Sequence, residues 1–228
     1  MNAPIKRGES AGRKDWIDVL GEAGDALEQL AVDEVLRRSR MGDPVAALDI
    51  DCSHSGLFLR LAQAGATVTA CDQDDFAVAV TDAAAAHAVG ERVDFVRSPL
   101  TALDSALLAD RAPFDLIVVH RSLPFLPFDA AEAVLRKLVG ALKIGGKIYV
   151  SAFGKYSELG DHYPDAGRFV QQRFAEIEPA IARKYGISGP LCLYSERDLF
   201  LLLFEAGVSV LKTFTTTHGN VKAVGVRV

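Results

Sequence analysis

The sequence predicts an α/β fold in which a mostly parallel, doubly wound sheet is covered by helices on both faces. After residue 44, short apolar runs rich in β-branched residues alternate with helical stretches. Near-continuous apolar runs of this kind are typical of parallel strands that are buried on both faces. Two β-rich runs end the sequence, Val208–Thr215 and Val221–Val228, and the Thr217-His218-Gly219-Asn220 segment between them predicts an antiparallel hairpin.

The order of the elements follows from the apolar pattern and its turn signals. Gly65 and Gly90 end two expected helices, Asp129 after Pro127 is expected to cap a third, and a capping box at Ser195 opens a fourth. The expected strands before the hairpin are Val45–Ile50, Thr67–Cys71, Val93–Val96, Phe114–His120 and Lys147–Phe153. The expected helices are Gly56–Ala64, Phe76–Val89, residues 129–142 and residues 195–206.

Composition narrows the class of protein without selecting a function. The 228 residues are 50% hydrophobic and 24% charged, so the chain can bury a large core and is not disordered. The net charge of −5 gives no general attraction to nucleic acid. Three scattered cysteines form neither a disulfide framework nor a zinc motif. With no secretory signal and no apolar stretch long enough for a bilayer, we expect a cytoplasmic protein without membrane contact.

Three regions are expected along the chain. Residues 1–13 are polar and predict a flexible tail, and residues 14–40 predict one or two amphipathic helices that break near Gly21–Gly24. Residues 41–228 predict a single domain with a lid-like insertion at 154–193. The middle of that insertion, from Phe169 to Ile177, is expected to be helical, with a kink at Pro179.

Polar residues at the ends of the first two strands mark the expected binding edge. Ligands of open parallel sheets bind beyond the carboxyl ends of the strands. Asp49 ends the first strand, and Asp72 ends the second, 23 residues later. An acid about 20 residues beyond a nucleotide-binding turn commonly accepts hydrogen bonds from ribose hydroxyls. Spacing alone leaves open the alternative that Asp72 only caps the following segment.

Five stretches together resemble the class I S-adenosylmethionine-dependent methyltransferases. They are VAALDIDCSHSG, LAQAGATVTACDQDD, FDLIVVHRSLPFLP, LRKLVGALKIGGKIYVSAF and LYSERDLFLLLFEAGVSV, which together extend from about Ala46 to the C-terminus. The resemblance implies a Rossmann-like, seven-stranded sheet whose last strand is antiparallel. It also implies S-adenosylmethionine as the cofactor, Asp49 in the acid position of the first loop, and Asp72 with Gln73 at the ribose.

Two stretches depart from the family pattern. The family usually carries an acid-x-Gly-x-Gly-x-Gly turn, whose glycines let the backbone approach the cofactor closely. Here Asp51, Ser53 and Ser55 occupy the glycine positions, and Gly56 follows one place late. The family also tends to place an acid after the third strand, where this sequence has Ser98, Pro99 and Leu100. The resemblance assigns all these residues to cofactor binding, with a degenerate loop.

Candidates for the chemistry lie at the fourth strand and in the insertion. His120 could act as a general base, and Arg121 could bind an acceptor carboxylate. Tyr156, His162 and Tyr163 precede the insertion's helix, which by resemblance covers the acceptor, and Trp16 would face it from the other side. Packing of the lid itself is the alternative role for these side chains. No residues are assigned to a metal.

Three functions remain open from the sequence. The first is methyl transfer to a small organic acceptor, the second a catalytically inactive methyltransferase-like subunit that regulates a partner. The third is a Mg²⁺-dependent phosphatase of the haloacid dehalogenase type, in which Asp49 and Asp51 would form the Asp-x-Asp motif and Gly160-Asp161 a later motif. The N-terminal helices and the hairpin edge are both plausible surfaces for a homodimer or a partner subunit.

Overall fold

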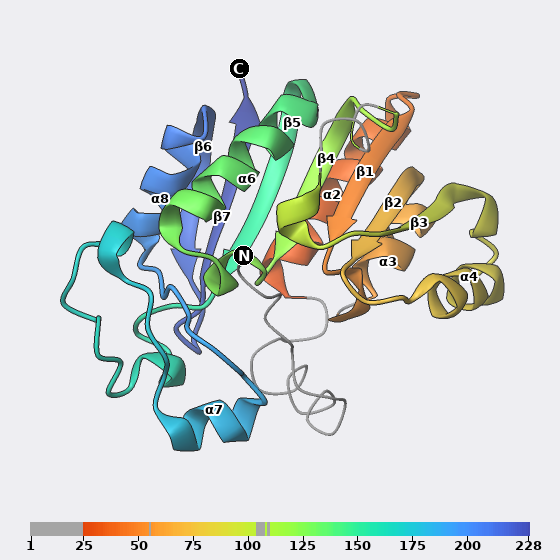
Figure 1. Cartoon of the computed structure of the whole chain (residues 1–228). Helices are drawn as coiled ribbons and strands as arrows, with labels where there is room; N and C mark the ends of the chain where they lie inside the picture. The colour runs from red at the N-terminus through yellow and green to blue at the C-terminus, as the bar shows by residue number, and fades with distance from the viewer. Residues whose placement is uncertain (1–24, 55, 104–107, 109) are drawn as a thin grey trace.

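One seven-stranded sheet organises the chain. The computed structural model describes residues 25–54, 56–103, 108 and 110–228 (Figure 1). The strand order is β3-β2-β1-β4-β5-β7-β6, with β1 to β5 parallel and β7 antiparallel to both of its neighbours. The strands are β1 Val45–Ile50, β2 Ala66–Asp72, β3 Val93–Arg97, β4 Phe114–His120, β5 Leu142–Ala152, β6 Val208–Thr215 and β7 Val221–Arg227. The predicted mostly parallel sheet with its C-terminal antiparallel hairpin is confirmed.

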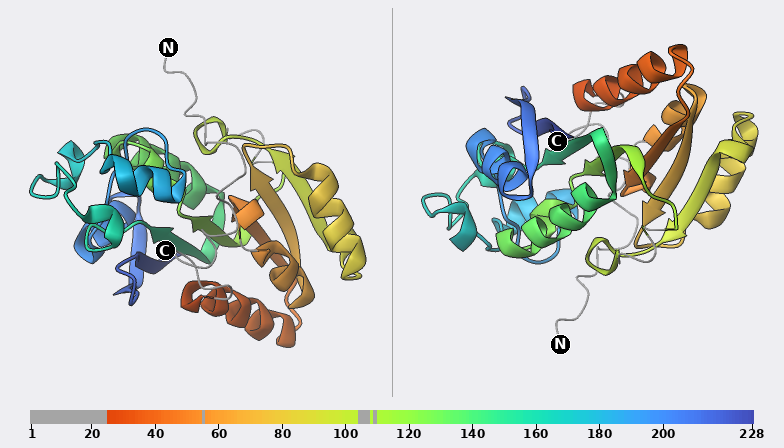
Figure 2. Two further views of the ribbon diagram at one scale, coloured as in Figure 1. Left: turned by 90° about the horizontal axis from the view of Figure 1, so that it is seen from below. Right: turned by 90° about the horizontal axis from the view of Figure 1, so that it is seen from above.

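Helices cover both faces of this sheet (Figure 2). The helices are α2 Ala26–Arg40, α3 Leu57–Gln63, α4 Ala77–Ala86, α6 Phe128–Ala141, α7 Pro179–Tyr185 and α8 Glu196–Glu205. Helix α8 begins with the predicted capping box at Ser195. The expected cap at Asp129 is wrong, because Pro127 is the N-cap of α6 and Asp129 lies in its first turn. An acid there still interacts favourably with the positive end of the helix dipole.

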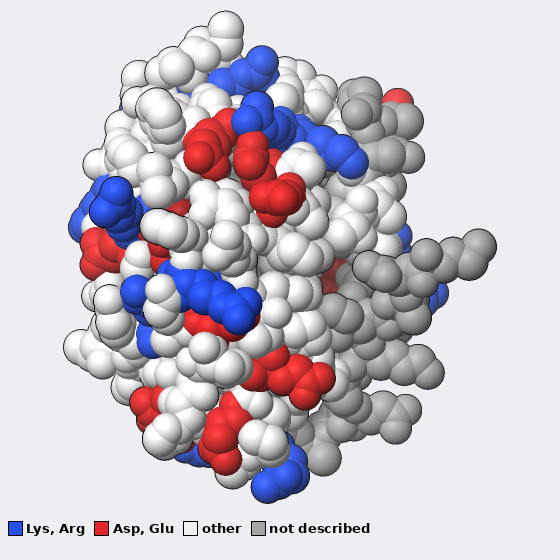
Figure 3. Space-filling view, turned by 60° about the vertical axis from the view of Figure 1, so that its left-hand side comes forward, with Lys and Arg blue, Asp and Glu red and all other residues white. Residues whose placement is uncertain are grey.

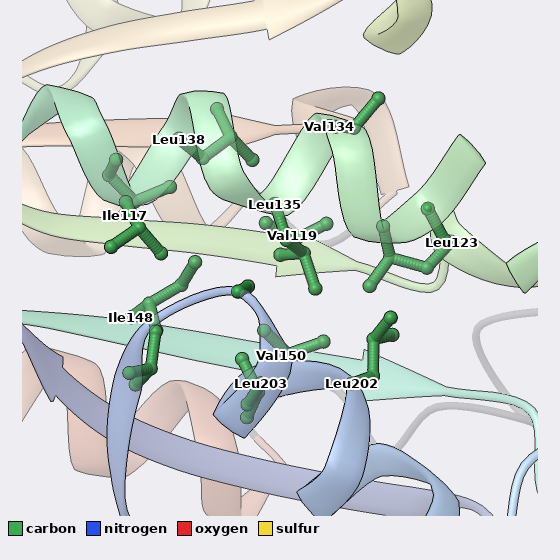
Figure 4. Packing of buried hydrophobic residues seen from close by; sticks show 14 of the residues in the cluster. Ile117, Val119, Leu123, Val134, Leu135, Leu138, Ile148, Val150, Leu202 and Leu203 are labelled. Atoms are coloured by element: carbon green, nitrogen blue, oxygen red, sulfur yellow. The ribbon is translucent and has the colours of Figure 1, made fainter. Parts of the chain in front are cut away.

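Each face carries its own hydrophobic core. On one face, α6 and α8 pack on β4 and β5, and Leu135, Val150 and Leu202 meet in the layer between them (Figure 4). On the other face, α2, α3 and α4 pack on β1 and β2 around side chains such as Leu27 and Leu61. The central strands β1, β2 and β4 are buried almost throughout, and every residue of β4 is buried. This explains why the strands could be recognised as continuous apolar runs.

Helix α2 runs along the sheet from its carboxyl edge to its amino edge. Its first turn lies at the carboxyl end of β4, where Glu28 approaches His120. Its last turn reaches the start of β4, where Arg38 forms an ion pair with Asp115. The second half of the segment predicted as an N-terminal lid is therefore one of the helices that cover the sheet, and only its first turn reaches the carboxyl edge.

The insertion after β5 forms a small core of its own. Buried side chains of Leu159, Tyr163, Ile181 and Tyr185 pack together there. The predicted helix from Phe169 to Ile177 is wrong: this stretch holds only a 3-10 turn at Val170–Gln172 and a bridge from Ala175 to Leu191. The helix is α7, and Pro179 is at its first position rather than at a kink, because proline lacks the N–H that the first helical turn leaves unbonded anyway.

The tip of the C-terminal hairpin docks on the start of the insertion. A Cβ atom added to Gly154 would lie 1.7 Å from the carbonyl oxygen of Gly219. Only glycine allows two backbones to approach so closely. This contact brings the start of β7 to the carboxyl edge of the sheet, where Lys222 pairs in register with Ser151 of β5.

The outer surface adds little evidence about partners. On the face shown in Figure 3, basic and acidic side chains are interspersed rather than gathered by sign. Among the helices of the described residues, none combines the length and the apolar character that crossing a membrane requires. The predicted cytoplasmic location stays a prediction.

Candidate functional site

The loops that follow β1, β2 and β3 meet at the carboxyl edge of the sheet. The backbone N–H of Ser53 donates to the Asp72 carboxylate at 3.4 Å, and the N–H of Ser98 donates to the Asp72 carbonyl oxygen at 2.8 Å. Pro99 and Leu100 follow Ser98 directly. The structure thus brings together these residues predicted to bind the cofactor, although they come from three separate strands.

The loop after β1 keeps a glycine-like backbone at Asp51. Its φ of 65° lies in the left-handed region, which non-glycine residues seldom adopt. Gly56, with φ 61°, precedes α3 in the same region. Asp and Asn tolerate this conformation better than other side chains do. The replacement of glycine by Asp51 therefore preserves the turn of the loop.

The side chain of Asp51 is held by the loop after β4. Ser122 donates its hydroxyl hydrogen to the Asp51 carboxylate at 2.6 Å, and both residues are buried. O–H···O distances of 2.5–2.7 Å are typical of ionised acceptors. This bond joins the β1 loop to the β4 loop across the carboxyl edge.

Asp49 is a buried carboxylate at the end of β1. Its side chain is 1% exposed, and its Oδ2 atom has no hydrogen-bond partner among the described residues. Burial raises the pKa of Asp49 to about 7; His120 opposes this rise, and Glu28 and Asp51 add to it. An unpaired buried polar atom is costly, and such atoms are commonly found where a ligand binds.

Asp72 is positioned by its own loop. Its Oδ1 atom accepts from the N–H of Asp74 at 3.1 Å, while Oδ2 receives the longer bond from Ser53. Each carboxylate oxygen can accept more than one hydrogen bond. Asp72 therefore caps the β2 loop and still has acceptor capacity for ribose hydroxyls. Gln73 follows it, and its carbonyl oxygen accepts from Arg97.

His120 lies in a buried group of charges contributed by the start of α2, by α3 and by β7. Its Nε2 atom is 3.2 Å from Glu28 and 3.6 Å from Asp25. Asp25 also pairs with Lys222 at 2.5 Å, and Glu28 with Arg60 at 2.6 Å. Burial alone lowers the pKa of His120, but the two carboxylates raise it above its ordinary value. An imidazolium donates hydrogen bonds and cannot accept a proton, so this arrangement does not favour a general base.

The ligand atoms of Asp25, Glu28 and His120 lie close enough together to hold a metal ion. Lys222 and Arg60 already neutralise the two carboxylates. A divalent cation would have to displace or repel these cations, and the group is better described as a network of ion pairs. Within the described residues we assign no metal site.

Arg121 follows His120 in an unusual conformation. Its φ is 56°, and its N–H donates to the carbonyl oxygen of Ser151. Burial lowers the pKa of its guanidinium, while Asp25 and Glu28 oppose this effect. Strained backbone at a loop of this kind is often associated with a functional site. Its role as an anchor for an acceptor carboxylate stays a prediction.

The predicted acceptor residues do not gather into one site. Tyr163 is buried inside the insertion's own core, where its hydroxyl donates to the carbonyl oxygen of Leu191 at 2.5 Å; this agrees with the alternative role in packing, and its assignment to the acceptor stays a prediction. Tyr156 is 74% exposed beneath the Lys155 ammonium, and His162 is also exposed. Trp16 and Ser55 lie outside the described residues.

Sequence reasoning missed four residues of this edge: Asp25, Glu28, Ser122 and Lys222. Lys222 had a signal, because a charged residue inside an otherwise apolar strand requires a buried partner. Asp25 and Glu28 had no such signal, since acids are common at the start of a helix, where they interact favourably with the helix dipole. Ser122 had none either, because its partner Asp51 is 71 residues away.

The comparisons with known proteins agree with this architecture. Residues 48–148 match the family described as methyltransferase domain, and the matched stretch contains the loops after β1 to β4. The matched stretch spans less than half of the 228 residues, and it makes the chain similar to methyltransferase domains rather than to phosphatases of the haloacid dehalogenase type. Gly160 ends a 3-10 turn and Asp161 follows it, so this pair does not follow a strand as the phosphatase alternative requires. No curated protein matches the sequence closely enough to count as a relative.

Solved structures show the same fold at low sequence identity. An O-methyltransferase family protein from Burkholderia thailandensis has a TM-score of 0.63 at 17% identity; the alignment covers 94% of this chain but only 59% of that chain. Magnesium protoporphyrin IX methyltransferase from Synechocystis has a TM-score of 0.62 at 20% identity, covering 96% and 95% of the two chains. The 1,6-didemethyltoxoflavin-N1-methyltransferase of Burkholderia thailandensis has a TM-score of 0.60 at 19% identity, covering 99% and 94%.

Proposed function

We propose that this protein transfers the methyl group of S-adenosylmethionine to a small organic acceptor. The observation that carries the proposal is Asp49, a fully buried carboxylate with an unpaired oxygen at the start of the cofactor loop. S-adenosylmethionine carries an ammonium and a sulfonium group, either of which would compensate this charge. The cofactor supplies the activated methyl group when it is bound.

The charges at the carboxyl edge of the sheet suggest separate positions for the cofactor and the acceptor. The ends of β1 and β2 present Asp49, Asp51 and Asp72, which suit a cationic cofactor with ribose hydroxyls. On the other side, His120 ends β4, Arg121 follows it, and Lys222 lies near the start of β7. These three cationic groups interact with Asp25 and Glu28 at the start of α2. We place the acceptor on this second side, with Arg121 as the group that binds its carboxylate.

The chain's own contribution to the reaction is alignment rather than proton transfer. Holding two reactants in line within a water-poor site can account for much of a rate enhancement. His120 serves this purpose as a buried support for the first turn of α2, because Glu28 and Asp25 favour its protonated form. An acceptor that is already nucleophilic needs no further base.

The choice of a small acceptor is supported by the neighbours and by surface charge. The Burkholderia toxoflavin enzyme is a solved complex with 1,6-didemethyltoxoflavin and S-adenosylhomocysteine, and the Synechocystis enzyme is named for magnesium protoporphyrin IX. Both are small organic molecules. The net charge of −5 does not favour nucleic acid as the acceptor.

Binding of S-adenosylhomocysteine is the direct test. Ligand at one hundred times its dissociation constant stabilises a protein by about 2.7 kcal/mol, so thermal unfolding should shift upward by several degrees. The measurement is a thermal-shift titration with S-adenosylmethionine and S-adenosylhomocysteine. Absence of a shift with both ligands at millimolar concentration contradicts the proposed enzyme and favours the inactive, methyltransferase-like subunit that the loop replacements also suggest.

Asp72→Asn tests the ribose assignment. Because the amide keeps the side chain's size and loses its charge, we expect the affinity for S-adenosylhomocysteine to fall on the order of tenfold or more. 5′-Methylthioadenosine shares the ribose and should lose affinity to the same extent. Isothermal titration calorimetry measures both. Asp74→Asn, at an exposed position two residues on, is the matched control, and unaltered affinities in Asp72→Asn would show that this residue only caps its loop.

A further inference from the structure

We infer that Asp51 and Ser122 form a fixed pair that presents a second carboxylate to the ammonium group of the cofactor, with Ser122 as the positioning residue. The inference rests on the proposed function, since it concerns the same ligand. It assigns a role to the residue that replaces the first glycine of the family's loop, and to the serine of the β4 loop that bonds to it.

The backbone at Asp51 is the first argument. With φ at 65°, the residue adopts the conformation for which glycine is usually selected. Glycine at this position would avoid the strain, yet the chain carries a carboxylate there. Unfavourable backbone conformations persist where the surrounding structure fixes them, and they are often found at functional sites. The side chain of Asp51 is therefore the feature to explain.

The bond to Ser122 is the second argument. The 2.6 Å distance indicates a charge-assisted hydrogen bond, and the carboxylate is buried together with its donor. Since a serine hydroxyl has one hydrogen, its 3.2 Å approach to the His120 carbonyl oxygen is the weaker interaction. The Asp51 carboxylate thus cannot rotate freely, and its orientation is determined by the β4 loop.

The neighbouring Asp49 is the third argument. The charge of Asp51 is one of the influences that raise the pKa of Asp49, so the two carboxylates lie within electrostatic range of one another. Asp49 also keeps an unpaired oxygen. Two buried carboxylates this close together are stable when a proton or a cation compensates the charge of one of them. The ammonium group at the amino-acid end of the cofactor is such a cation.

Two ligands separate this role from general support of the loop. S-adenosylhomocysteine has the ammonium group, whereas 5′-methylthioadenosine keeps the adenosine and lacks the amino-acid portion. Isothermal titration calorimetry with both ligands would be applied to the full chain and to Ser122→Ala, Asp51→Asn and the double variant. Ser209→Ala, at an exposed position of β6, is the matched control.

We expect Ser122→Ala to weaken the binding of S-adenosylhomocysteine on the order of tenfold, and Asp51→Asn to weaken it by at least as much. The double variant should be no worse than Asp51→Asn, because Ser122 acts through Asp51. The affinity for 5′-methylthioadenosine should stay within about twofold. Asp51→Gly serves as a second variant that accepts the same φ without strain, and it should reproduce the selective loss.

Three results would overturn the inference. They are unchanged S-adenosylhomocysteine affinity in Ser122→Ala and Asp51→Gly, equal losses for both ligands, or additive losses in the double variant. Failure of the unsubstituted protein to bind S-adenosylhomocysteine is a different outcome, because it overturns the proposed function and the inference with it.

Discussion

Asp49→Asn should make the protein without ligand more stable at pH 8 and weaken its binding of the cofactor. Because burial raises the pKa of Asp49 to about 7, the folded state binds this proton more tightly than the unfolded state does. Stability from this group is present at low pH and is lost as the pH rises from about 4 to 7. Asparagine has no charge to bury, and we expect the free energy of unfolding at pH 8 to rise by a few kcal/mol. At roughly 2–4 °C per kcal/mol, the rise in Tm should exceed about 5 °C.

The same substitution should remove the pH dependence of ligand binding. The ammonium group of the ligand favours the ionised form of Asp49, so below about pH 7 the protein must release a proton to bind it. Affinity for S-adenosylhomocysteine should therefore fall as the pH decreases from 7, by at most about tenfold per unit. In Asp49→Asn the affinity should be at least about tenfold weaker at pH 7.5 and nearly flat between pH 5.5 and 7.5.

Asp43→Asn is the matched control for both measurements, since Asp43 is exposed in the loop before β1. It should alter neither Tm nor affinity noticeably. If Asp49→Asn lowers the Tm at pH 8, or if its affinity follows the same pH profile as that of the unsubstituted protein, then Asp49 is a satisfied structural carboxylate rather than a ligand-binding group.

The central strands of the sheet could be predicted from the sequence because they are buried on both faces, whereas the edge strand β6 is largely exposed. The bounds of β1, β4 and β6 agree with the apolar runs, and the hairpin follows from its turn residues. The insertion could not be predicted as well. Its stretch around Phe169 has helical spacing, but tertiary contacts decide its conformation: Ala175 bonds to Leu191, and Arg173 donates to the carbonyl oxygen of Leu193.

Those residues of the candidate site that lie at strand ends could be predicted from the sequence. Residues that join the site through side-chain contacts could not. The strand ends position Asp49 and Asp72 for any sequence with this topology, so spacing located them. The partners of those residues come from distant parts of the chain. Ser122 bonds to Asp51, and α2 brings Glu28 beside His120, although no local pattern marks either contact. Tyr163 is a residue type suited to a lid over an acceptor, but its side chain packs in the insertion's own core.

Glu28→Gln should destabilise the fold more than any surface substitution does. The side chain is 1% exposed, and its two oxygens face Arg60 at 2.6 Å and His120 at 3.2 Å. Removing one partner of a buried ion pair leaves the other charges uncompensated, at a cost of about 3–5 kcal/mol. Because Arg60 is 31% exposed and partly solvated, we expect the lower half of this range and a Tm lowered by about 6–16 °C.

Glu132→Gln gives the matched comparison, because Glu132 pairs with Arg136 on the exposed face of α6. Exposed pairs of this spacing contribute about 0.5 kcal/mol or less, so the Tm of Glu132→Gln should hardly change.

The buried group of charges around His120 also predicts a pH dependence of stability with a definite sign. The raised pKa of His120 gives stability that is complete below its unfolded pKa of about 6.5 and is lost as the pH rises through the folded value. Glu28→Gln should reduce that loss, since one of the two carboxylates that raise the pKa is gone. If Glu28→Gln is as mild as Glu132→Gln and keeps the full pH slope, the first turn of α2 is not fixed to β4 by these charges, and the site must be held by its loops alone.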